Sequence, residues 1–263
     1  MSSNPAASAA SRYWEARARR FATEGRGLQA VCSYGMPLFY NQYIHATQRA
    51  ALRQWLRPPA GTRVLELGCG VGRWSRRLAA AGAFVTGVDL SPTMVEEAMR
   101  RAKAAGAGDR CEFIEGDAAD LALGRSFDLI LCVTVVQHIL SPDRMQSAID
   151  RMAAHLAPGG RMVMLEAAPS THDGRCDSTT FIARTESCYR HAFAQAGLRC
   201  LTMTGVDPLR VKSRFLPNYA KLSRPLANAV LLAVTAVSLP CDLMLAPICP
   251  SRSWHKVFVL GAA

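Results

Sequence analysis

Short apolar runs alternate with segments of helical periodicity through the middle of the chain. Two segments, "SPTMVEEAMRRAKAAG" and "SPDRMQSAIDRMAAHLAPGG", begin with Ser-Pro, a pair typical of a helix N-cap and first turn. The apolar runs have the length of buried strands. They predict strands over residues 63–67, 84–89, 111–115, 127–133 and 161–166. This alternation predicts a parallel sheet covered by helices on both faces, with ligands bound at the carboxyl ends of the strands.

The regions on either side follow other patterns. Residues 1–10 are rich in Ser and Ala and are expected to be a disordered leader. Residues 11–57 have helical periodicity and predict an N-terminal helical cap. The strand–helix alternation occupies residues 58–206, and "WHKVFVL" within residues 254–263 predicts a closing strand. The strand–helix alternation and the closing strand are expected to form one domain, to which the N-terminal helical cap is added.

Residues 207–253 form an insert before the closing strand. Its segment 225–250, "PLANAVLLAVTAVSLPCDLMLAPICP", contains Asp242 as the only charged residue. Pro240 and Asp242 interrupt the segment and leave about 14 residues on its longer arm, whereas a spanning helix needs ~20. The sequence therefore predicts a broken helical hairpin, which either lies on a membrane surface, covers the pocket or forms a homodimer contact. Basic residues just before it would suit anionic headgroups: Arg210, Lys212, Arg214, Lys221 and Arg224.

Composition narrows the class of protein. The chain has 263 residues, half of them hydrophobic, which is enough to bury a sizeable core. Its net charge of +11 favours anionic surfaces in general, but no RNA-binding module is recognisable, so nucleic acid is not expected as a partner. Nine cysteines without a CxxC pair predict free thiols and no metal site. With no signal-peptide pattern, we expect a cytoplasmic protein, peripheral at the inner face of the membrane if the insert binds lipid.

The stretch "VLELGCGVGRWS", residues 64–75, predicts a strand, a tight glycine loop and a helix start. Such a loop commonly holds a nucleotide-like ligand. A triphosphate loop needs Gly-Lys-Ser/Thr after its glycines, and this stretch has none. A dinucleotide loop would have glycine at position 73, where this chain has Arg73. The loop therefore predicts another kind of ligand.

Three acidic residues near the loop indicate which ligand that is. Glu66 lies at the end of the first predicted strand, Asp89 at the end of the second, and Asp117 just past the third. Glu66 would repel a pyrophosphate and favour an ammonium group. Asp89 is placed to accept hydrogen bonds from ribose hydroxyls, and Asp117 from the exocyclic amine of a purine. Together they predict an adenosine that carries a positively charged amino-acid arm, which describes S-adenosylmethionine.

Five segments resemble the successive motifs of class I S-adenosylmethionine-dependent methyltransferases. They are "VLELGCGVGRWS", "VTGVDLSPTMVEEA", "FIEGDAADL", "FDLILCVTVVQHI" and "LAPGGRMVMLE". The resemblance covers residues 60–206 and implies a Rossmann-like, doubly wound α/β sheet, mostly parallel with an antiparallel last strand. It implies S-adenosylmethionine as cofactor, with the methionine amino group held by the backbone near Cys132. The cofactor-binding residues implied are Glu66, Gly68, Gly70, Gly72, Asp89, Leu90, Asp117, Ala118 and Cys132.

Methyl transfer from a sulfonium is an in-line displacement, so the protein mainly has to align the acceptor and exclude water. His138, after the fourth strand, is a candidate base, and packing is its alternative role. Tyr34, Tyr40 and Tyr43 are candidates for an aromatic lid over the sulfonium, or else for core packing of the cap. We expect methyl transfer to a small-molecule acceptor. The alternatives are displacement on the amino-acid arm, which releases methylthioadenosine, and a non-catalytic S-adenosylmethionine-binding module.

Overall fold

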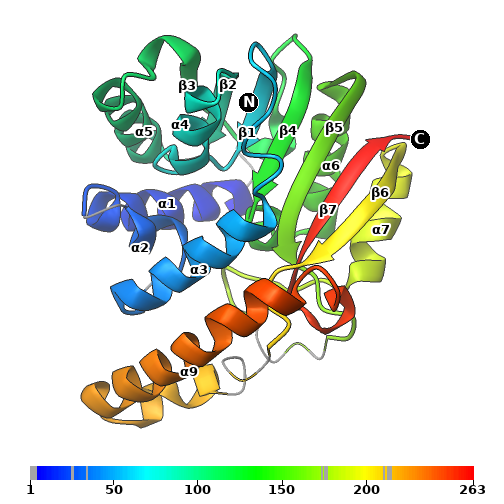
Figure 1. Ribbon diagram of the computed structural model, residues 1–263. Coiled ribbons are helices and arrows are strands. Elements are labelled where there is room, and N and C mark those ends of the chain that lie inside the picture. Colours follow the sequence, from blue (N-terminus) through cyan, green and yellow to red (C-terminus); the bar gives the residue numbers. More distant parts are fainter. Residues whose placement is uncertain are drawn as a thin grey trace.

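The computed structural model describes residues 5–24, 27–33, 35–172, 174, 177–209, 211 and 215–263. Within this part of the chain, seven strands form one sheet in the order β3-β2-β1-β4-β5-β7-β6 (Figure 1). Strand β7 runs antiparallel to both of its neighbours, and the pairs from β3 to β5 are parallel. The strands are β1 (Arg63–Leu67), β2 (Phe84–Asp89), β3 (Cys111–Glu115), β4 (Phe127–Val133), β5 (Leu156–Ala167), β6 (Leu198–Gly205) and β7 (His255–Ala262). The predicted Rossmann-like class is confirmed, and only β5 begins earlier than its predicted segment.

Both faces of the sheet are apolar, because alternate residues along each strand pack on opposite sides. In β4, Ile130 and Cys132 belong to one hydrophobic core, while Leu129 and Leu131 belong to the other. The first core lies under α6 (Pro142–Ala154) and α7 (Glu186–Gln195), and the second under α4 (Arg73–Ala80). A helix α5 (Pro92–Ala104) packs beside β2 and β3. Short 3-10 turns are η1 (Gly108–Arg110), η2 (Ala118–Asp120), η3 (Val136–His138), η4 (Leu216–Lys221) and η5 (Pro250–Arg252).

Among the described residues, three helices precede the sheet: α1 (Pro5–Phe21), α2 (Leu28–Val31) and α3 (Leu38–Ala51). They lie toward the end of the sheet where the parallel strands finish (Figure 1). The expected disordered leader of residues 1–10 needs correction, because the structure places residues 5–10 in α1. Pro5 suits a first helical turn, and the alanines that follow have the highest helix propensity.

The hydrophobic insert forms one continuous helix, α9 (Arg224–Leu245), of 22 residues. The predicted broken hairpin is therefore wrong: Pro240 lies inside the helix, and Asp242 is buried without ending it. Asp242 is tolerated because its carboxylate accepts hydrogen bonds from the Tyr43 hydroxyl and, at 2.8 Å, from the Leu209 backbone N–H. The helix packs alongside α3 (Figure 1). By length and composition alone, it is the one described helix that could cross a membrane.

Candidate active site at the carboxyl ends of the strands

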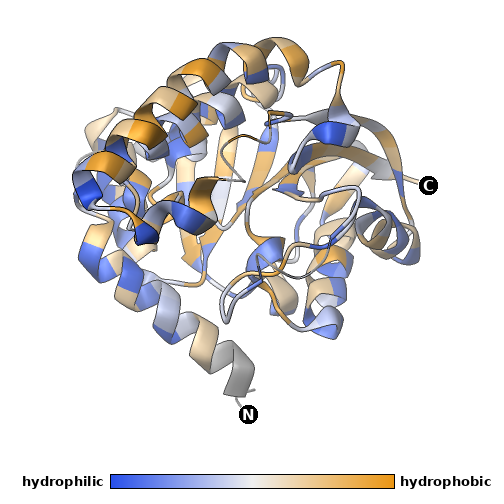
Figure 2. Cartoon of the chain, turned by 90° about the horizontal axis from the view of Figure 1, so that it is seen from below, coloured by the Kyte–Doolittle hydropathy of each residue, from blue (hydrophilic) through white to orange (hydrophobic). Residues whose placement is uncertain are grey.

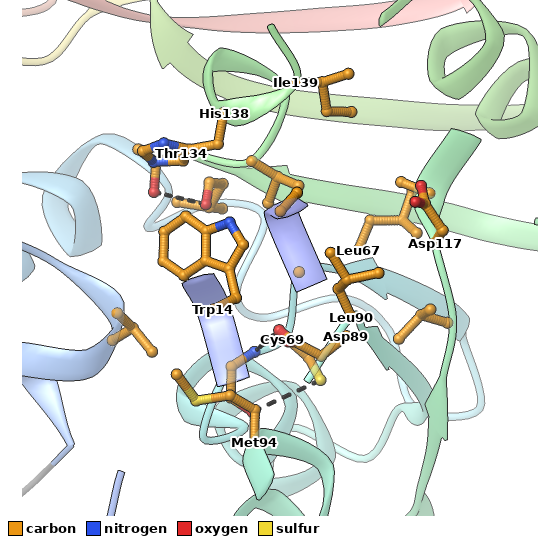
Figure 3. A pocket seen from close by; sticks show the side chains of 18 of the residues that line it. Trp14, Leu67, Cys69, Asp89, Leu90, Met94, Asp117, Thr134, His138 and Ile139 are labelled. Carbon is orange, nitrogen blue, oxygen red and sulfur yellow. Dashed lines mark hydrogen bonds between the residues drawn. The ribbon is translucent and has the colours of Figure 1, made fainter. Parts of the chain in front are cut away.

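A cavity of about 350 Å³ lies at the carboxyl ends of β1, β2 and β4, beneath α1 (Figure 3). This volume is within the usual range for a small-molecule site. One side, which we call the sheet wall, is formed by the strand ends and the loops after them. The opposite side, the helical wall, comes from α1, α2 and the residue that follows α2. Seven of the nine predicted cofactor-binding residues line the cavity: Glu66, Gly68, Gly70, Asp89, Leu90, Asp117 and Ala118.

The glycine loop approaches neighbouring segments too closely for side chains. A Cβ at Gly68 would lie 2.2 Å from Cγ2 of Val135, and one at Gly70 would lie 2.5 Å from Cγ1 of Val31. Both glycines also have positive φ angles, +63° and +52°, which other residues rarely adopt. The loop thus brings backbone rather than side chains to the cavity, as a cradle for a bound ligand requires.

Gly72 and Cys132 do not line the cavity, although the role predicted at Cys132 is one for the backbone near it. Gly72 is the N-cap of α4, and a Cβ there would lie 3.1 Å from Ala98 and from Phe113, so its small size serves packing. The Cys132 side chain is fully buried in the core under α6, because alternate positions of β4 face the two cores. The next residues, Val133 and Thr134, line the cavity instead.

Asp89 is held firmly at the end of β2. Its Oδ2 accepts a hydrogen bond of 2.8 Å from the Gly70 N–H, and its Oδ1 accepts one of 3.0 Å from the Ser91 N–H. Each carboxylate oxygen has a second lone pair. Because both oxygens are fixed by backbone groups and the residue lines the cavity, Asp89 can accept hydrogen bonds from two vicinal hydroxyls of a ligand.

Glu66 is a buried carboxyl group on the sheet wall. Burial raises its pKa to about 7, against the opposing effects of a hydrogen bond from the Ser75 hydroxyl and the nearby Arg73 guanidinium. Arg73 also lines the cavity; its Nη2 donates to Oε1 of Gln48 at 2.8 Å, and its Nη1 lies 3.1 Å from Nδ1 of His45. A ligand with an ammonium group beside a carboxylate would complement this pair of charges.

Both carboxylate oxygens of Asp117 already accept hydrogen bonds within the protein, which the sequence did not predict. Its Oδ1 accepts a hydrogen bond of 2.9 Å from the Ala119 N–H, and its Oδ2 accepts one of 2.7 Å from the Arg144 guanidinium. Arg144 comes from α6, and nothing in the spacing of the motifs pointed to it. Asp117 and Arg144 therefore line the cavity as an ion pair, and a ligand amine would share the carboxylate with the guanidinium.

The loop after β4 contains an unusual backbone conformation. Thr134 has a φ of +56°, which is strained for a β-branched residue. Glu166 stabilises the loop, since its carboxylate accepts hydrogen bonds of 2.9–3.0 Å from the N–H groups of Val135, Val136 and Gln137. This arrangement fixes the direction in which His138 leaves the loop. The strain lies at a residue that lines the cavity, as is common for ligand-binding loops.

His138 lines the cavity and lies next to Trp14 of α1 (Figure 3). The two rings meet edge to face with centroids 4.8 Å apart. The His138 Nδ1 lies 2.6 Å from the Thr180 carbonyl oxygen, which can only accept, so Nδ1 carries the proton and Nε2 keeps its lone pair. Burial lowers the pKa of His138 to about 4, and the charge of Arg17 acts in the same direction. His138 is therefore neutral at pH 7.

Of the two roles considered for the tyrosines, a lid or core packing, Tyr40 and Tyr43 have the second. Tyr34 lies outside the described residues. Tyr40 and Tyr43 are buried against Leu231 of α9 rather than in the cavity, because the face of α3 that carries them packs on α9. Burial raises the pKa of both phenols, and the Asp242 carboxylate adds to this effect at Tyr43. The aromatic residues of the helical wall are instead Tyr13 and Trp14, which no motif identified.

Comparison with known proteins agrees with the motifs. Residues 64–160 match a family model described as a methyltransferase domain. A demethylmenaquinone methyltransferase of Clavibacter sepedonicus is 36% identical over 119 residues, which are 45% of this chain and 46% of that protein. A ubiquinone biosynthesis O-methyltransferase of Xanthomonas axonopodis pv. citri is 36% identical over 108 residues, 40% and 43% of the two chains. The chain thus spans about half the length of the curated relatives it matches.

One solved structure shares the fold over the whole of both chains. It is a magnesium protoporphyrin IX methyltransferase of Synechocystis PCC 6803 with bound S-adenosylmethionine, with a TM-score of 0.64 and 18% identity. The residues of the described cavity suit such a cofactor, since the glycine loop brings backbone to the cavity and the Asp89 carboxylate at its edge can accept from ribose hydroxyls. Residues 64–160 thus form a methyltransferase domain within a chain of the same fold, and their motifs resemble those of the class I methyltransferases that use S-adenosylmethionine as cofactor.

Proposed function

We propose that this protein transfers the methyl group of S-adenosylmethionine to a small-molecule acceptor. The observation that carries the proposal is the contrast between the two walls of one cavity. Carboxylates and glycines line the sheet wall, and apolar and aromatic residues of α1 and α2 form most of the helical wall. An acceptor bound against the helical wall would face the cofactor in a space that excludes water. The similar proteins named above are all methyltransferases named for small-molecule compounds or their biosynthesis.

The residues of the sheet wall have distinct roles in this proposal. The cofactor supplies a methyl group already activated by its sulfonium. Asp89 holds the ribose hydroxyls, and Glu66 attracts the ammonium of the amino-acid arm. Arg73, at the edge of the glycine loop, is placed to attract the carboxylate of the same arm. These contacts fix the cofactor against the sheet and leave its sulfonium side toward α1.

We assign to His138 the role of contacting the nucleophilic group of the acceptor. The Gln137 amide Nε2 lies 3.4 Å from the His138 Nε2, a long contact that a nucleophilic group could replace as donor to this lone pair, since Nδ1 is already donating to Thr180. With a pKa of about 4, His138 is a weak base at pH 7. It would orient the nucleophile and take its proton only if that proton is itself acidic, as in a phenol or a thiol.

The test is mass spectrometry of the purified protein with S-adenosylmethionine, alone and with a metabolite extract from the host. S-adenosylhomocysteine that forms only with the extract is the expected result, together with a methylated product. Asp89→Ala is the matched control and should form much less. Methylthioadenosine without acceptor, above spontaneous breakdown, would contradict methyl transfer and indicate displacement on the amino-acid arm. Binding of the cofactor with no product under any condition would indicate a binding module.

A further inference from the structure

Helix α9 carries its polar side chains on the side that faces the protein. Thr235, Ser238 and Asp242 recur at helical spacing and are all buried. A fourth polar residue, Asn228, accepts a hydrogen bond of 2.5 Å from the Tyr219 hydroxyl. Surface helices of soluble proteins have the opposite arrangement, with apolar residues inside and polar residues outside. The polarity of α9 is therefore inverted.

The solvent side of α9 is apolar without interruption. Every exposed residue between positions 225 and 248 is apolar, and Val237, Met244 and Ile248 are 65–75% exposed. We define the outer face of α9 by the large exposed residues of the helix, Leu226, Leu232, Val237, Leu243 and Met244, together with Ile248 just beyond its C-terminal end. A 22-residue helix is about 33 Å long, so this face is a long apolar strip. Figure 2 shows the predominance of hydrophobic residues along α9. Strips of this kind mark surfaces that are covered by another body.

The charges around the outer face indicate what covers it. Asp242 is the only acidic residue between positions 208 and 254, and it is buried. Lys221 and Arg224 are exposed at the N-terminal end of the helix. An apolar strip with cations at its end and no exposed acid complements a bilayer with anionic headgroups. The helix also contains no aromatic residue, whereas the cores of protein–protein interfaces are enriched in them.

The topology decides how such a helix meets the bilayer. The strands before and after the insert are neighbours, and Gly205 of β6 pairs with Lys256 of β7. The insert therefore leaves and re-enters the sheet at one edge, which excludes a single crossing. Asp242 and Tyr43 also attach the inner side of α9 to α3. We propose that the outer face of α9 lies in the plane of an anionic membrane surface and docks the protein there.

Flotation with lipid vesicles tests this proposal independently of any enzymatic activity. The full chain should float with vesicles of phosphatidylcholine and phosphatidylglycerol at low salt, and less at high salt. Leu232→Glu together with Val237→Glu should abolish flotation, because each places a carboxylate among lipid tails and anionic headgroups. Met99→Glu is the matched control, since Met99 is an equally exposed apolar residue on α5 and should leave flotation unchanged.

Other outcomes would overturn the proposal. Thermal unfolding and S-adenosylmethionine affinity of the variants should equal those of the parent chain, since the substituted side chains are exposed and outside the cavity. Absence of flotation at low salt, or equal flotation with pure phosphatidylcholine, would contradict an anionic membrane surface. A dimer seen by light scattering that Leu232→Glu dissociates would instead assign the outer face to a second copy of the chain.

Discussion

The two walls of the cavity are built from the sequence in different ways. The sheet wall comes from strand ends and the loops that directly follow them, so neighbours in sequence are neighbours in the site. The helical wall comes from α1 and α2, and its residues reach the cavity only because these helices pack over the strand ends. Motifs therefore describe the cofactor side, and long-range packing determines the proposed acceptor side.

The walls also differ in how they are attached. Backbone N–H groups hold the Asp89 carboxylate of the sheet wall directly. The helical wall depends on Glu15 of α1, whose carboxylate accepts hydrogen bonds of 2.6 Å from the hydroxyls of Ser91 and Thr93. These two residues begin α5, where the helix dipole favours a negative charge. Glu15 thus adds a polar attachment to the apolar packing of α1 against Val71 and Met94, and a single substitution can remove it, so the helical wall is the easier one to disturb.

The largest effect is expected on the sheet wall. Asp89→Ala removes both ribose hydrogen bonds of the proposed complex and should weaken S-adenosylmethionine binding by about 1–3 kcal/mol, or roughly 5- to 150-fold in Kd. Titration calorimetry measures this change directly. Asp109→Ala, at an exposed position in η1, is the matched control and should bind normally. An unchanged Kd for Asp89→Ala would refute the assignment of this residue to the ribose.

This difference between the walls explains how much could be predicted from sequence. Four of the five strands that were assigned residue by residue have the predicted bounds, because each apolar run ends at a glycine or a polar residue. The continuity of α9 could not be predicted, because Pro240 and Asp242 are local helix-breaking signals. Asp242 is compensated by Tyr43, which is 199 residues away in the sequence. Trp14 was missed for the same reason, since its place opposite His138 depends on the docking of α1.

The second largest effect is expected for the attachment of the helical wall. Glu15→Ala removes the three hydrogen bonds that its carboxylate accepts from the start of α5, donated by the Ser91 hydroxyl, the Thr93 hydroxyl and the Thr93 N–H. It also removes the one donated by Arg19 within α1, and should loosen α1 by about 1–2 kcal/mol. Burial alone would raise the pKa of Glu15, but hydrogen bonds from Ser91, Thr93 and Arg19 lower it to about 2, so the carboxylate is ionised throughout the neutral range. Hydrogen exchange should show faster exchange in α1.

Glu24→Ala is the matched control for this substitution, because Glu24 is exposed just after α1. It should leave exchange in α1 unchanged. If both variants exchange alike, Glu15 does not fasten the helical wall. Methyl transfer should fall about tenfold in Glu15→Ala while S-adenosylmethionine affinity changes less, because the proposed acceptor lies against α1 and the cofactor against the sheet.

An effect on stability without an effect on the reaction rate is expected for Tyr43, which lies outside the cavity. Tyr43→Phe removes the hydroxyl that donates to buried Asp242, which keeps its bond from the Leu209 N–H. We expect the free energy of unfolding to fall by about 1–2 kcal/mol, measured by urea titration. The rate of methyl transfer should not change, because Tyr43 does not line the cavity. A large loss of kcat with normal stability would restore Tyr43 as a catalytic candidate.

The smallest effect concerns the pH dependence of cofactor binding on the sheet wall. In the free protein the pKa of Glu66 is about 7, raised by burial. A bound ammonium favours the ionised carboxylate and lowers this pKa, so binding below about pH 7 releases a proton and affinity rises with pH up to that point. Glu66→Gln should remove this rise and weaken binding less than tenfold at about pH 7.5. Calorimetry in two buffers of different ionisation enthalpy counts the released proton, and an equal proton release in both proteins would show that another group is responsible.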